Sequence, residues 1–393
     1  MSSGHGCSQT ISKSSSQAIT CRAAAVCWGA EELLKIEEVE VEPPRSSEVR
    51  VKILFASVCH TDILRWKGRP LAFFPRVLGH EGVGIVESIG EGVTNLKEGD
   101  LVIPTFIGEC QECRNCLSGK TNICENYPLH RHGLMPDLSS RMHVRGQRLY
   151  HMFTCATWSE YTVVNVNYVT KIDPRVPLPH ASLISCGFST GFGATWKETK
   201  IERGSTVAVF GLGGVGLGVI IGARMRGASK IIGIDLNESK KEKGEFFGMT
   251  DFIKSGQSHQ FISQEIKEMT KGVGVDYSFE CTGVEPLINE ALESTAVGTG
   301  VTISIGISEK GIAPINLVAL LSGSRTLKGS VFGGIKPQTD LPTIIEKCIN
   351  KEIELDALVS HEVQLEDINQ AFELLKQPDC LKIVIQVNKS LSC

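Results

Sequence analysis

Apolar and polar residues alternate along the first part of the chain, in the period-two pattern of half-buried β-strands. The alternation is clear at residues 36–41 and 49–53, and Pro43-Pro44 separates the two runs. Between residues 79 and 99, six glycines interrupt short apolar runs, which predicts strands joined by tight turns. We therefore expect residues 21–105 to be rich in β structure.

The pattern is irregular over residues 106–150, and strand-like sequence returns at 151–175. Near residue 190 it changes again, because helix-length segments now separate short apolar runs. Strands that alternate with helices are typical of a parallel, doubly wound sheet, so the fold class is α/β. The predicted strands of this part are 206–210, 230–235, 251–253, 276–280 and 301–305, with a charged helix at 237–247. Beyond residue 333 the sequence predicts helices at 341–351 and 368–376 and a last strand at 382–387.

The length of 393 residues predicts two domains. Residues 1–20 are polar, rich in Ser and without an apolar run, so we expect a disordered tail and no secretory signal. The uncharged stretch at 205–223 has the length of a membrane span, but its six glycines favour a strand, a turn and a buried helix. We expect a cytoplasmic protein that binds no membrane.

Charge and cysteine content narrow the function further. The net charge is −4, with 40 basic and 44 acidic side chains, which argues against electrostatic binding of nucleic acid or anionic lipid. The 14 cysteines are the more informative count. Cytosolic cysteines are mostly reduced, so we expect the clustered ones to be metal ligands or catalytic residues rather than disulfides.

A glycine-rich turn indicates a dinucleotide site. Gly211, Gly213 and Gly216 form the pattern G-x-G-x-x-G between a predicted strand and a predicted helix, which is the context that the motif requires. The free N–H groups at the helix N-terminus suit a pyrophosphate. Asp235 ends the next predicted strand, and its carboxylate suits the 2′-hydroxyl of an adenosine ribose but would repel a 2′-phosphate. The sequence therefore favours NAD over NADP.

Four cysteines lie within fifteen residues, at positions 110, 113, 116 and 124. Four thiolates can close a tetrahedral shell around zinc and leave no open position, which predicts a structural site at Cys110, Cys113, Cys116 and Cys124. Iron–sulfur ligation is the alternative, since C-x2-C-x2-C also begins ferredoxin motifs. Those motifs usually continue x3-C-P, whereas here the fourth cysteine follows seven residues and precedes Glu125.

Three further segments could form a second metal site. They are Cys59-His60-Thr61-Asp62, Gly79-His80-Glu81 and Cys186-Gly187. None is specific alone, because a single His or Cys is more often a packed core residue. Together Cys59, His80 and Cys186 would make a Cys2His shell with an open fourth position, as in catalytic zinc sites.

These motifs occur in an order that resembles the zinc-containing medium-chain alcohol dehydrogenases, most of all their plant alcohol dehydrogenase-like branch. The resemblance covers about residues 20–387 and includes the segment 185–191. It implies a discontinuous, GroES-like, β-rich catalytic domain at 21–188 and 333–393, with a Rossmann domain that binds NAD at 189–332. It also implies a homodimer with two zinc ions per subunit, one catalytic and one structural.

The resemblance further implies roles for single residues. Thr61 would accept the alcohol proton, Asp62 would orient the ligand histidine, and Glu81 could approach the catalytic zinc transiently. His60 and Lys382 would contact the cofactor pyrophosphate, and Lys240 would lie near the ribose. Thr190 and Val215 would pack on the nicotinamide, and Ile307 would also contact the cofactor. The apolar substrate wall would comprise Phe106, Leu129, Met152, Phe153 and Val331, with Ile307 beside it.

The implied reaction is reversible hydride transfer between a small primary or secondary alcohol and NAD, which gives an aldehyde or ketone. Zinc would act as a Lewis acid toward the alcohol oxygen. One position departs from many relatives, because Leu64 stands where they carry a histidine that relays the proton. We therefore expect slower proton release, or a route through water or His60. A hydroxynitrile lyase on the same zinc and NAD scaffold is the alternative.

Overall fold

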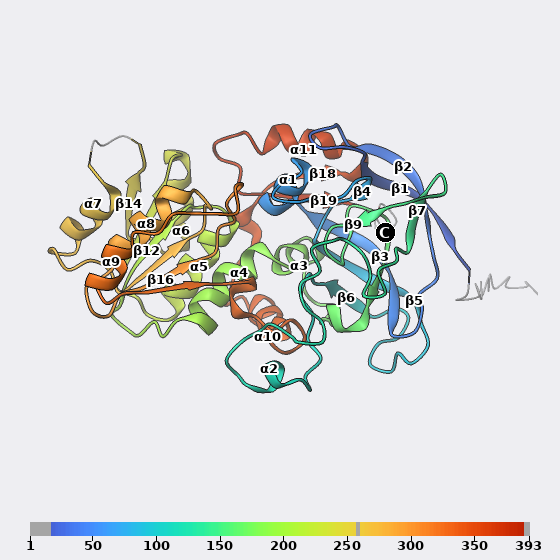
Figure 1. Ribbon diagram of the computed structural model, residues 1–393, viewed down its shortest axis with the longest axis horizontal. Coiled ribbons are helices and arrows are strands. Elements are labelled where there is room, and N and C mark those ends of the chain that lie inside the picture. The colour runs from blue at the N-terminus through green and yellow to red at the C-terminus, as the bar shows by residue number, and fades with distance from the viewer. Residues whose placement is uncertain (1–16, 257–259, 389–393) are drawn as a thin grey trace, which may run out of the picture.

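The computed structural model describes residues 17–256 and 260–388 and shows two bodies along its longest axis (Figure 1). One body is rich in β structure, and the other is a parallel sheet covered by helices. Residues 1–16 of the predicted tail lie outside the described residues. Ile19 and Thr20 correct that prediction, because they begin strand β1 and pair with Val41 and Glu40 of the neighbouring strand.

The first sheet of the β-rich body has the strand order β8-β7-β2-β1-β4-β9. Its longest pair, β1 and β2, is antiparallel and follows the alternation seen in the sequence. Two of its strands, β7 and β8, lie in the region predicted to be irregular. The bounds are β1 (Ile19–Cys27), β2 (Lys35–Val41), β4 (Arg76–Val77), β7 (Met142–Val144), β8 (Gln147–Arg148) and β9 (Tyr150–His151).

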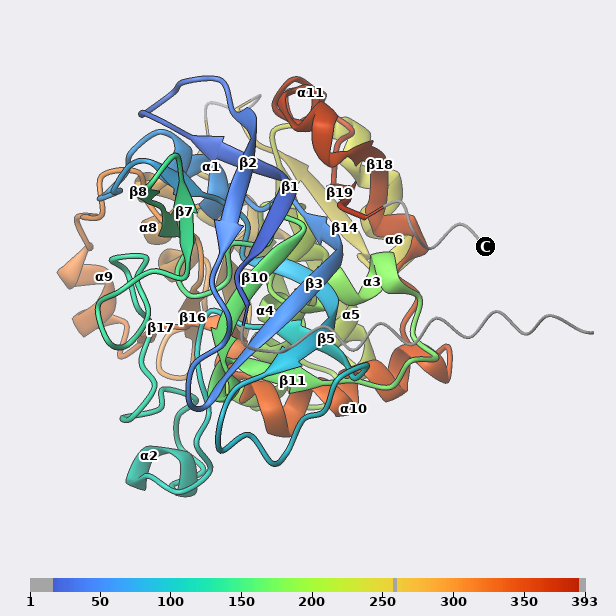
Figure 2. The ribbon, with the colours of Figure 1, turned by 90° about the vertical axis from the view of Figure 1, so that its right-hand side faces the viewer.

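The second sheet has the order β11-β6-β5-β3-β19-β18, and β10 pairs with β3 beside this path. Its last two strands come from the C-terminal part of the chain, since β19 pairs antiparallel with β3 and places Val384 opposite Ser57. Figure 2 shows β18 and β19 returning beside the early strands. The bounds are β3 (Glu48–Ser57), β5 (Glu81–Ile89), β6 (Leu101–Pro104), β10 (Tyr161–Asn165), β11 (Val169–Lys171), β18 (Val359–Gln364) and β19 (Lys382–Gln386).

The second body has the parallel order β14-β13-β12-β15-β16-β17. The strand order reverses between β12 and β15, and ligands of such sheets bind where the order reverses, at the carboxyl ends of the strands. The strands are β12 (Thr206–Phe210), β13 (Lys230–Asp235), β14 (Asp251–Lys254), β15 (Tyr277–Glu280), β16 (Val301–Ser304) and β17 (Thr326–Gly329). Their helices are α5 (Gly214–Met225), α6 (Lys241–Phe247), α7 (Ile262–Met269), α8 (Glu285–Glu293) and α9 (Leu317–Ser322).

Helix α4 (Gly187–Gly193) packs against helix α5 of the second body. Helix α4 packs so closely on α5 that a Cβ added to Gly191 would lie 1.8 Å from the carbonyl oxygen of Val215. The largest hydrophobic cluster contains residues of both bodies. The remaining helices are α1 (His60–Trp66), α2 (Arg114–Leu117), α3 (Leu178–Ile184), α10 (Pro337–Ile349) and α11 (Ile368–Leu374). Short 3₁₀ turns lie at Val166–Tyr168, Glu238–Lys240, Phe332–Gly334, Asp356–Leu358 and Leu365–Asp367, and a π turn at Ala194–Glu198.

The GroES-like and Rossmann-type architecture expected from the sequence is confirmed, and most boundaries fall within a few residues of the expected ones. Helix α10 begins four residues earlier than predicted, with Pro337 in its first turn, where the missing N–H costs nothing. Strands β17 and β18 were not predicted. The mostly exposed β17 is the short edge strand of its sheet, and it lacks the apolar run that identifies its neighbours.

Candidate active site

The first metal-ligand segment lies where strand β3 gives way to helix α1. Cys59 is the N-cap of α1, and its backbone N–H donates to the Asp62 carboxylate over 3.3 Å. The other oxygen of that buried carboxylate accepts from the backbone of Gly79 and lies 3.0 Å from Nδ1 of His80. Asp62 therefore lies where it can hold the imidazole through Nδ1, and its orienting role at a metal stays a prediction.

Three distant segments converge at this point. Ligand atoms of Cys59, His80, Glu81 and Cys186 all lie within 4.8 Å of one another. Cys186 reaches the cluster because it is the N-cap of α4, directly after α3. Two thiols and one imidazole, with the carboxylate of Glu81 nearby, fit zinc with three protein ligands and one open position. The structure thus brings together the predicted Cys59, His80 and Cys186.

Neighbouring groups favour the charged forms of Cys59 and His80 but the neutral thiol of Cys186. A hydrogen bond from the Cys186 thiol holds the pKa of Cys59 well below its ordinary value, and His80 acts in the same direction. The same bond, together with burial, raises the pKa of Cys186. Burial lowers the pKa of His80, but the Asp62 and Cys59 charges outweigh it and raise that pKa overall. Cys59 is therefore the thiol that loses its proton first.

Glu81 is held from three sides. Its carboxylate contacts the Lys382 ammonium and accepts hydrogen bonds from Ser57 Oγ and, at 2.9 Å, from the backbone N–H of Gly187. Burial raises the pKa of Glu81, and Lys382 opposes that shift. Lys382 also donates to the Val58 carbonyl at 3.1 Å. Its predicted contact with a pyrophosphate stays a prediction, and Lys382 lines the cleft beside the glycine turn.

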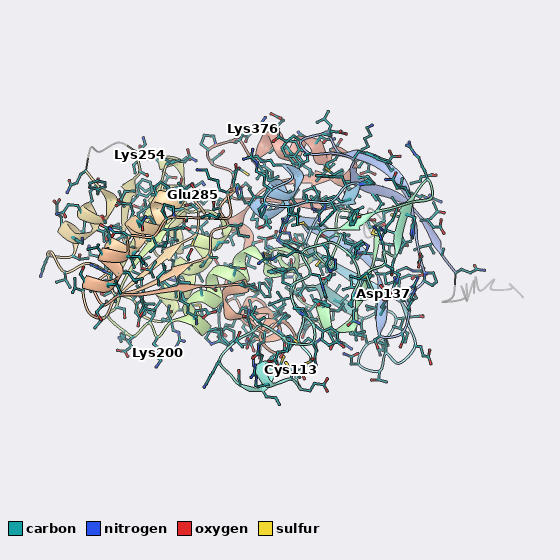
Figure 3. All side chains as sticks on the ribbon, in the orientation of Figure 1. Cys113, Asp137, Lys200, Lys254, Glu285 and Lys376 are labelled. Carbon is teal, nitrogen blue, oxygen red and sulfur yellow. The ribbon has the colours of Figure 1, made fainter. Side chains whose placement is uncertain are left out.

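The four-cysteine lobe lies apart from this cluster, around α2, and Figure 3 labels Cys113 there. All four sulfur atoms lie within 4.8 Å of one another. The Sγ–Sγ separations of the pairs Cys110–Cys116 and Cys113–Cys124 are both 3.9 Å. Zinc–sulfur bonds of about 2.3 Å in a tetrahedron give sulfur separations of about 3.8 Å, so the geometry fits a closed zinc site.

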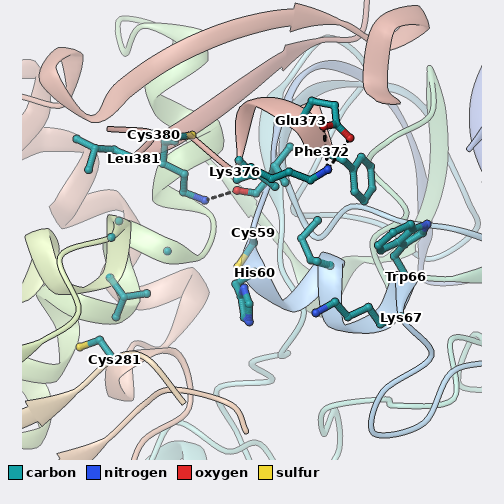
Figure 4. A pocket seen from close by; sticks show the side chains of 18 of the residues that line it. Cys59, His60, Trp66, Lys67, Cys281, Phe372, Glu373, Lys376, Cys380 and Leu381 are labelled. Carbon is teal, nitrogen blue, oxygen red and sulfur yellow. Dashed lines mark hydrogen bonds and ion pairs between the residues drawn. The ribbon is translucent and has the colours of Figure 1, made fainter. Parts of the chain in front are cut away.

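A cleft of about 580 Å³ lies between the two bodies. Its lining includes Cys59, His60, Val215, Lys240, Cys281 and Lys382, together with the glycine turn from Gly213 to Gly216. Figure 4 shows Cys59 and His60 on one side and Cys281 on the other. Cys59 of the metal cluster and the dinucleotide turn therefore face one space. The sequence predicted no role for Cys281. It lies in this cleft because it directly follows strand β15.

The glycine turn has the geometry that the motif predicts. Gly211 has a φ of +92°, which side chains rarely adopt. A Cβ on Gly216 would lie 1.8 Å from the Gly211 carbonyl oxygen, whereas one on Gly213 would meet nothing within 4 Å. The open face at Gly213 leaves room for a pyrophosphate at the start of α5.

Asp235 and Lys240 lie beside this turn. Asp235 accepts from the backbone N–H of Leu212 at 2.8 Å and from that of Asn237 at 2.9 Å. Lys240 Nζ lies 3.5 Å from the same carboxylate. This places an acid and a base at the end of β13, where the sequence expected the adenosine ribose. The contacts that Asp235 and Lys240 would make with the cofactor stay predictions.

Aromatic rings surround the His80 imidazole. Phe106 and Phe153 contact it edge-on, with centroid distances of 5.5 and 5.6 Å. Phe332 packs on Phe106 at 5.0 Å, a neighbour that sequence reasoning missed because it lies 226 positions away. Two of the predicted wall residues thus lie beside the metal cluster.

The other expected wall and relay positions differ in exposure. Met152 is fully buried, Leu129 is half-buried, and Ile307 and Val331 are exposed at 48% and 39%. Thr190 is buried in α4, and Thr61 is half-buried in α1. Leu64 is only 1% exposed, so an apolar side chain is buried at the position where many relatives carry the relay histidine. Among the described residues, no helix is long and apolar enough to cross a membrane.

Comparison with known proteins agrees with this site. Residues 45–174 match the alcohol dehydrogenase GroES-like domain, and residues 214–350 match the zinc-binding dehydrogenase domain. "CYP enzymes assisting alcohol dehydrogenase" of Catharanthus roseus is 62% identical over 375 residues, 94% of this chain and 99% of that protein. "Alcohol dehydrogenase 1" of Tanacetum cinerariifolium is 55% identical over 370 residues, 93% and 97% of the two chains.

A solved structure shares the whole architecture. The alcohol dehydrogenase zinc-binding domain protein from Burkholderia ambifaria superposes with a TM-score of 0.86 at 30% identity, over 95% of this chain and 99% of that one. The β-rich body and the parallel-sheet body are therefore those of one class of protein. This class is the zinc-dependent dehydrogenases with a GroES-like domain and a Rossmann domain. The chain belongs to the zinc-containing medium-chain alcohol dehydrogenases, in their plant branch.

Proposed function

We propose that the protein catalyses reversible hydride transfer between a primary or secondary alcohol and NAD, as an alcohol dehydrogenase with one catalytic and one structural zinc ion per subunit. One observation carries the proposal. The same cleft is lined by Cys59 of the metal-ligand cluster and by the Gly213–Gly216 turn that suits a dinucleotide. A reacting alcohol carbon at the metal would therefore lie near a nicotinamide.

Each group of side chains has a distinct task in this proposal. Cys59, His80 and Cys186 hold the catalytic zinc, which when bound supplies Lewis acidity toward the alcohol oxygen. Asp62 keeps the His80 ring oriented through its bond to Nδ1. Thr61, two residues after Cys59 in α1, accepts the alcohol proton through its hydroxyl. Phe106 and Phe153 exclude water from the side of the imidazole.

The coenzyme side uses the glycine turn on the opposite wall of the cleft together with His60, which follows Cys59. The start of α5 and His60 receive the pyrophosphate, Asp235 and Lys240 the adenosine ribose, and Thr190, Val215 and Ile307 the nicotinamide half. The carboxylate of Asp235 supports NAD over NADP. We expect a higher kcat/KM with NAD than with NADP. An equal or higher value with NADP would contradict this assignment.

The proposed activity is tested with the purified, metal-loaded protein. NADH absorbance is followed with NAD and a panel of primary and secondary alcohols, while cyanide release is followed from acetone cyanohydrin. NADH without cyanide supports the dehydrogenase. Cyanide without NADH supports the hydroxynitrile lyase. We include this alternative because the apolar Leu64 at the relay position is compatible with a lyase. Cys59→Ala should abolish either activity, because it removes a ligand of the catalytic metal.

We also propose a homodimer formed through the coenzyme domain. Strand β17 is an exposed edge of the parallel sheet, and helix α9 beside it exposes apolar side chains. Three of them, Leu317, Val318 and Leu321, are 62–75% exposed. Such an apolar face and a free strand edge suit a second copy of the chain. Sedimentation equilibrium should give twice the subunit mass, and Leu321→Glu should shift it toward the monomer.

The remaining assignments complete the proposal. We divide the chain into a catalytic domain at 21–188 and 333–393 and an NAD-binding domain at 189–332. This division agrees with the return of β18 and β19 to the first body. We place the protein in the cytoplasm, where a fluorescent fusion of the full-length chain would test it.

A further inference from the structure

The guanidinium of Arg65 lies in an unusual environment. Arg65 is in helix α1, six residues after the ligand Cys59, and its side chain is only 8% exposed. Within the described residues, its hydrogen bonds go to the backbone carbonyls of Leu71 and Arg69, the latter at 3.4 Å. No ion pair with a carboxylate compensates its charge in that part of the chain. A buried charge without an acidic partner is costly, so its other contact is informative.

That other contact is an aromatic ring. The Cζ atom of Arg65 lies 5.7 Å from the centroid of the Phe153 ring, within the range of a cation–π interaction. Such contacts are stronger where water is excluded, and Phe153 is only 6% exposed. The charges of Arg76 and Arg131 repel that of Arg65, so the attractive contacts of its guanidinium are the two carbonyls and the face of the Phe153 ring.

Phe153 connects this contact to the metal cluster. Its ring meets the His80 imidazole edge-on at 84° and lies 5.6 Å from the Phe106 ring. Its backbone has a φ of +54°, a region that bulky side chains rarely occupy. A relaxed backbone therefore does not by itself determine the position of the Phe153 ring. A fixed group packed behind the ring would determine that position.

We propose that Arg65 is a positioning residue for substrate selection, whose guanidinium holds the Phe153 ring against His80 and so limits the width of the space beside the catalytic metal. This inference rests on the proposed alcohol dehydrogenase function. It assigns Arg65 no contact with substrate or cofactor. Without the cation the ring can turn, and the site accepts wider alcohols.

The kinetic test compares a slim alcohol, 1-hexanol, with a wide one, cyclohexylmethanol. Arg65→Met keeps most of the apolar stem but removes the charge. We expect the ratio of kcat/KM values, slim over wide, to fall about fivefold, with the KM for NAD changed less than about twofold. Arg65→Lys keeps a cation and should restore most of the ratio. Phe153→Leu should lower it as Arg65→Met does, and the double variant should lower it no further.

The control is Arg145→Met. Its guanidinium lies over the Trp28 ring at 5.6 Å, but its side chain is 72% exposed and neither residue lines the cleft. This variant should leave the ratio unchanged. An unchanged ratio in Arg65→Met, or additive losses in the double variant, would overturn the proposal. If Arg65→Met does not fold, an unchanged ratio in Phe153→Leu overturns it as well.

A second measurement needs no activity. With 4-fluorophenylalanine placed at position 153, the fluorine resonance reports the surroundings of the ring. Arg65→Met should shift and broaden that resonance, Arg65→Lys should shift it less, and Arg145→Met should leave it in place. An unaltered resonance in Arg65→Met overturns the proposal. If the wild-type protein oxidises no alcohol, the proposed function fails, whereas the fluorine measurement still decides whether Arg65 positions the ring.

Discussion

The Nζ atom of Lys67 lies 2.7 Å from Oε1 of Glu309, and Arg69 reaches the other carboxylate oxygen at 2.8 Å. Lys67 directly follows helix α1 of the β-rich body, whereas Glu309 lies in the loop after strand β16 of the coenzyme body. The two ion pairs therefore connect the two sides of the molecule. Lys67 and His60 both line the cleft, and the charge of His60 acts on Glu309.

Glu309→Gln should speed coenzyme release. The two ion pairs are half-exposed, and such pairs are weak, so we expect a release rate only about two to five times faster. Stopped-flow fluorescence of NADH release measures this rate, and added salt should reduce the difference between wild type and variant. Glu352→Gln, which breaks the exposed pair with Lys347, is the control. Equal release rates at low salt would show that the ion pairs do not restrain opening.

Cys113→Ser should remove the structural zinc and leave the catalytic one. A structural zinc site contributes folding free energy directly, so we expect a loss of stability of the order of several kcal/mol. Metal analysis should fall from two zinc ions per subunit to one, and the thermal midpoint should fall with it. Cys348→Ser is the control, because Cys348 lies in α10 outside both clusters. Two zinc ions retained in Cys113→Ser would refute the four-cysteine assignment.

Leu64→His tests the proton route. Leu64 is buried in α1, so an imidazole there has a polar group to satisfy and should cost about 1–3 kcal/mol of stability. If the relay limits the wild-type enzyme, hydride transfer near neutral pH should become about tenfold faster. Single-turnover kinetics across pH measure this, with Leu64→Met as the matched apolar control. No gain over Leu64→Met would indicate that water or His60 already carries the proton.

The two metal sites show what sequence could and could not predict. Cys110 to Cys124 form a site because short spacing alone keeps four thiols together in one lobe. Cys59 and Cys186 are 127 positions apart, so no local pattern pairs them. Only the resemblance to a family predicted that they bind the same metal. The contact of Lys382 with Glu81 spans 301 positions and became visible only in the fold, because β19 returns to pair with β3.

The substrate side was the least predictable part. The wall positions Phe106 and Phe153 were expected from the resemblance, but their edge-on contacts with His80 depend on how a loop turns at a positive φ. Arg65 carried no signal, since one arginine in a short helix normally reaches solvent. Its burial follows from the neighbouring loop, whose carbonyls at Arg69 and Leu71 accept from it.

His151 should make the fold sensitive to mild acid. Burial first, and then the charges of Arg141 and Arg76, lower the pKa of His151 to about 3. In the unfolded chain the imidazole binds a proton near pH 6.5, so below that pH the unfolded state holds more protons than the folded state. Stability therefore rises with pH across this window, and it is lost as the pH falls from about 6.5 toward 3, by at most about 1.4 kcal/mol per pH unit.

His151→Gln removes this proton uptake and keeps a polar side chain near Ser140, whose hydroxyl lies 3.2 Å from Nε2 of His151. We expect the variant to be less stable than wild type at pH 7.5, because buried packing changes, but to lose less stability between pH 7.5 and 5. Denaturant unfolding at several pH values measures both quantities. His143→Gln, at a half-exposed position in strand β7 of the same sheet, should keep the wild-type slope. A His151→Gln slope equal to that of wild type would mean that the imidazole is protonated in the folded protein, which its burial between two arginines opposes.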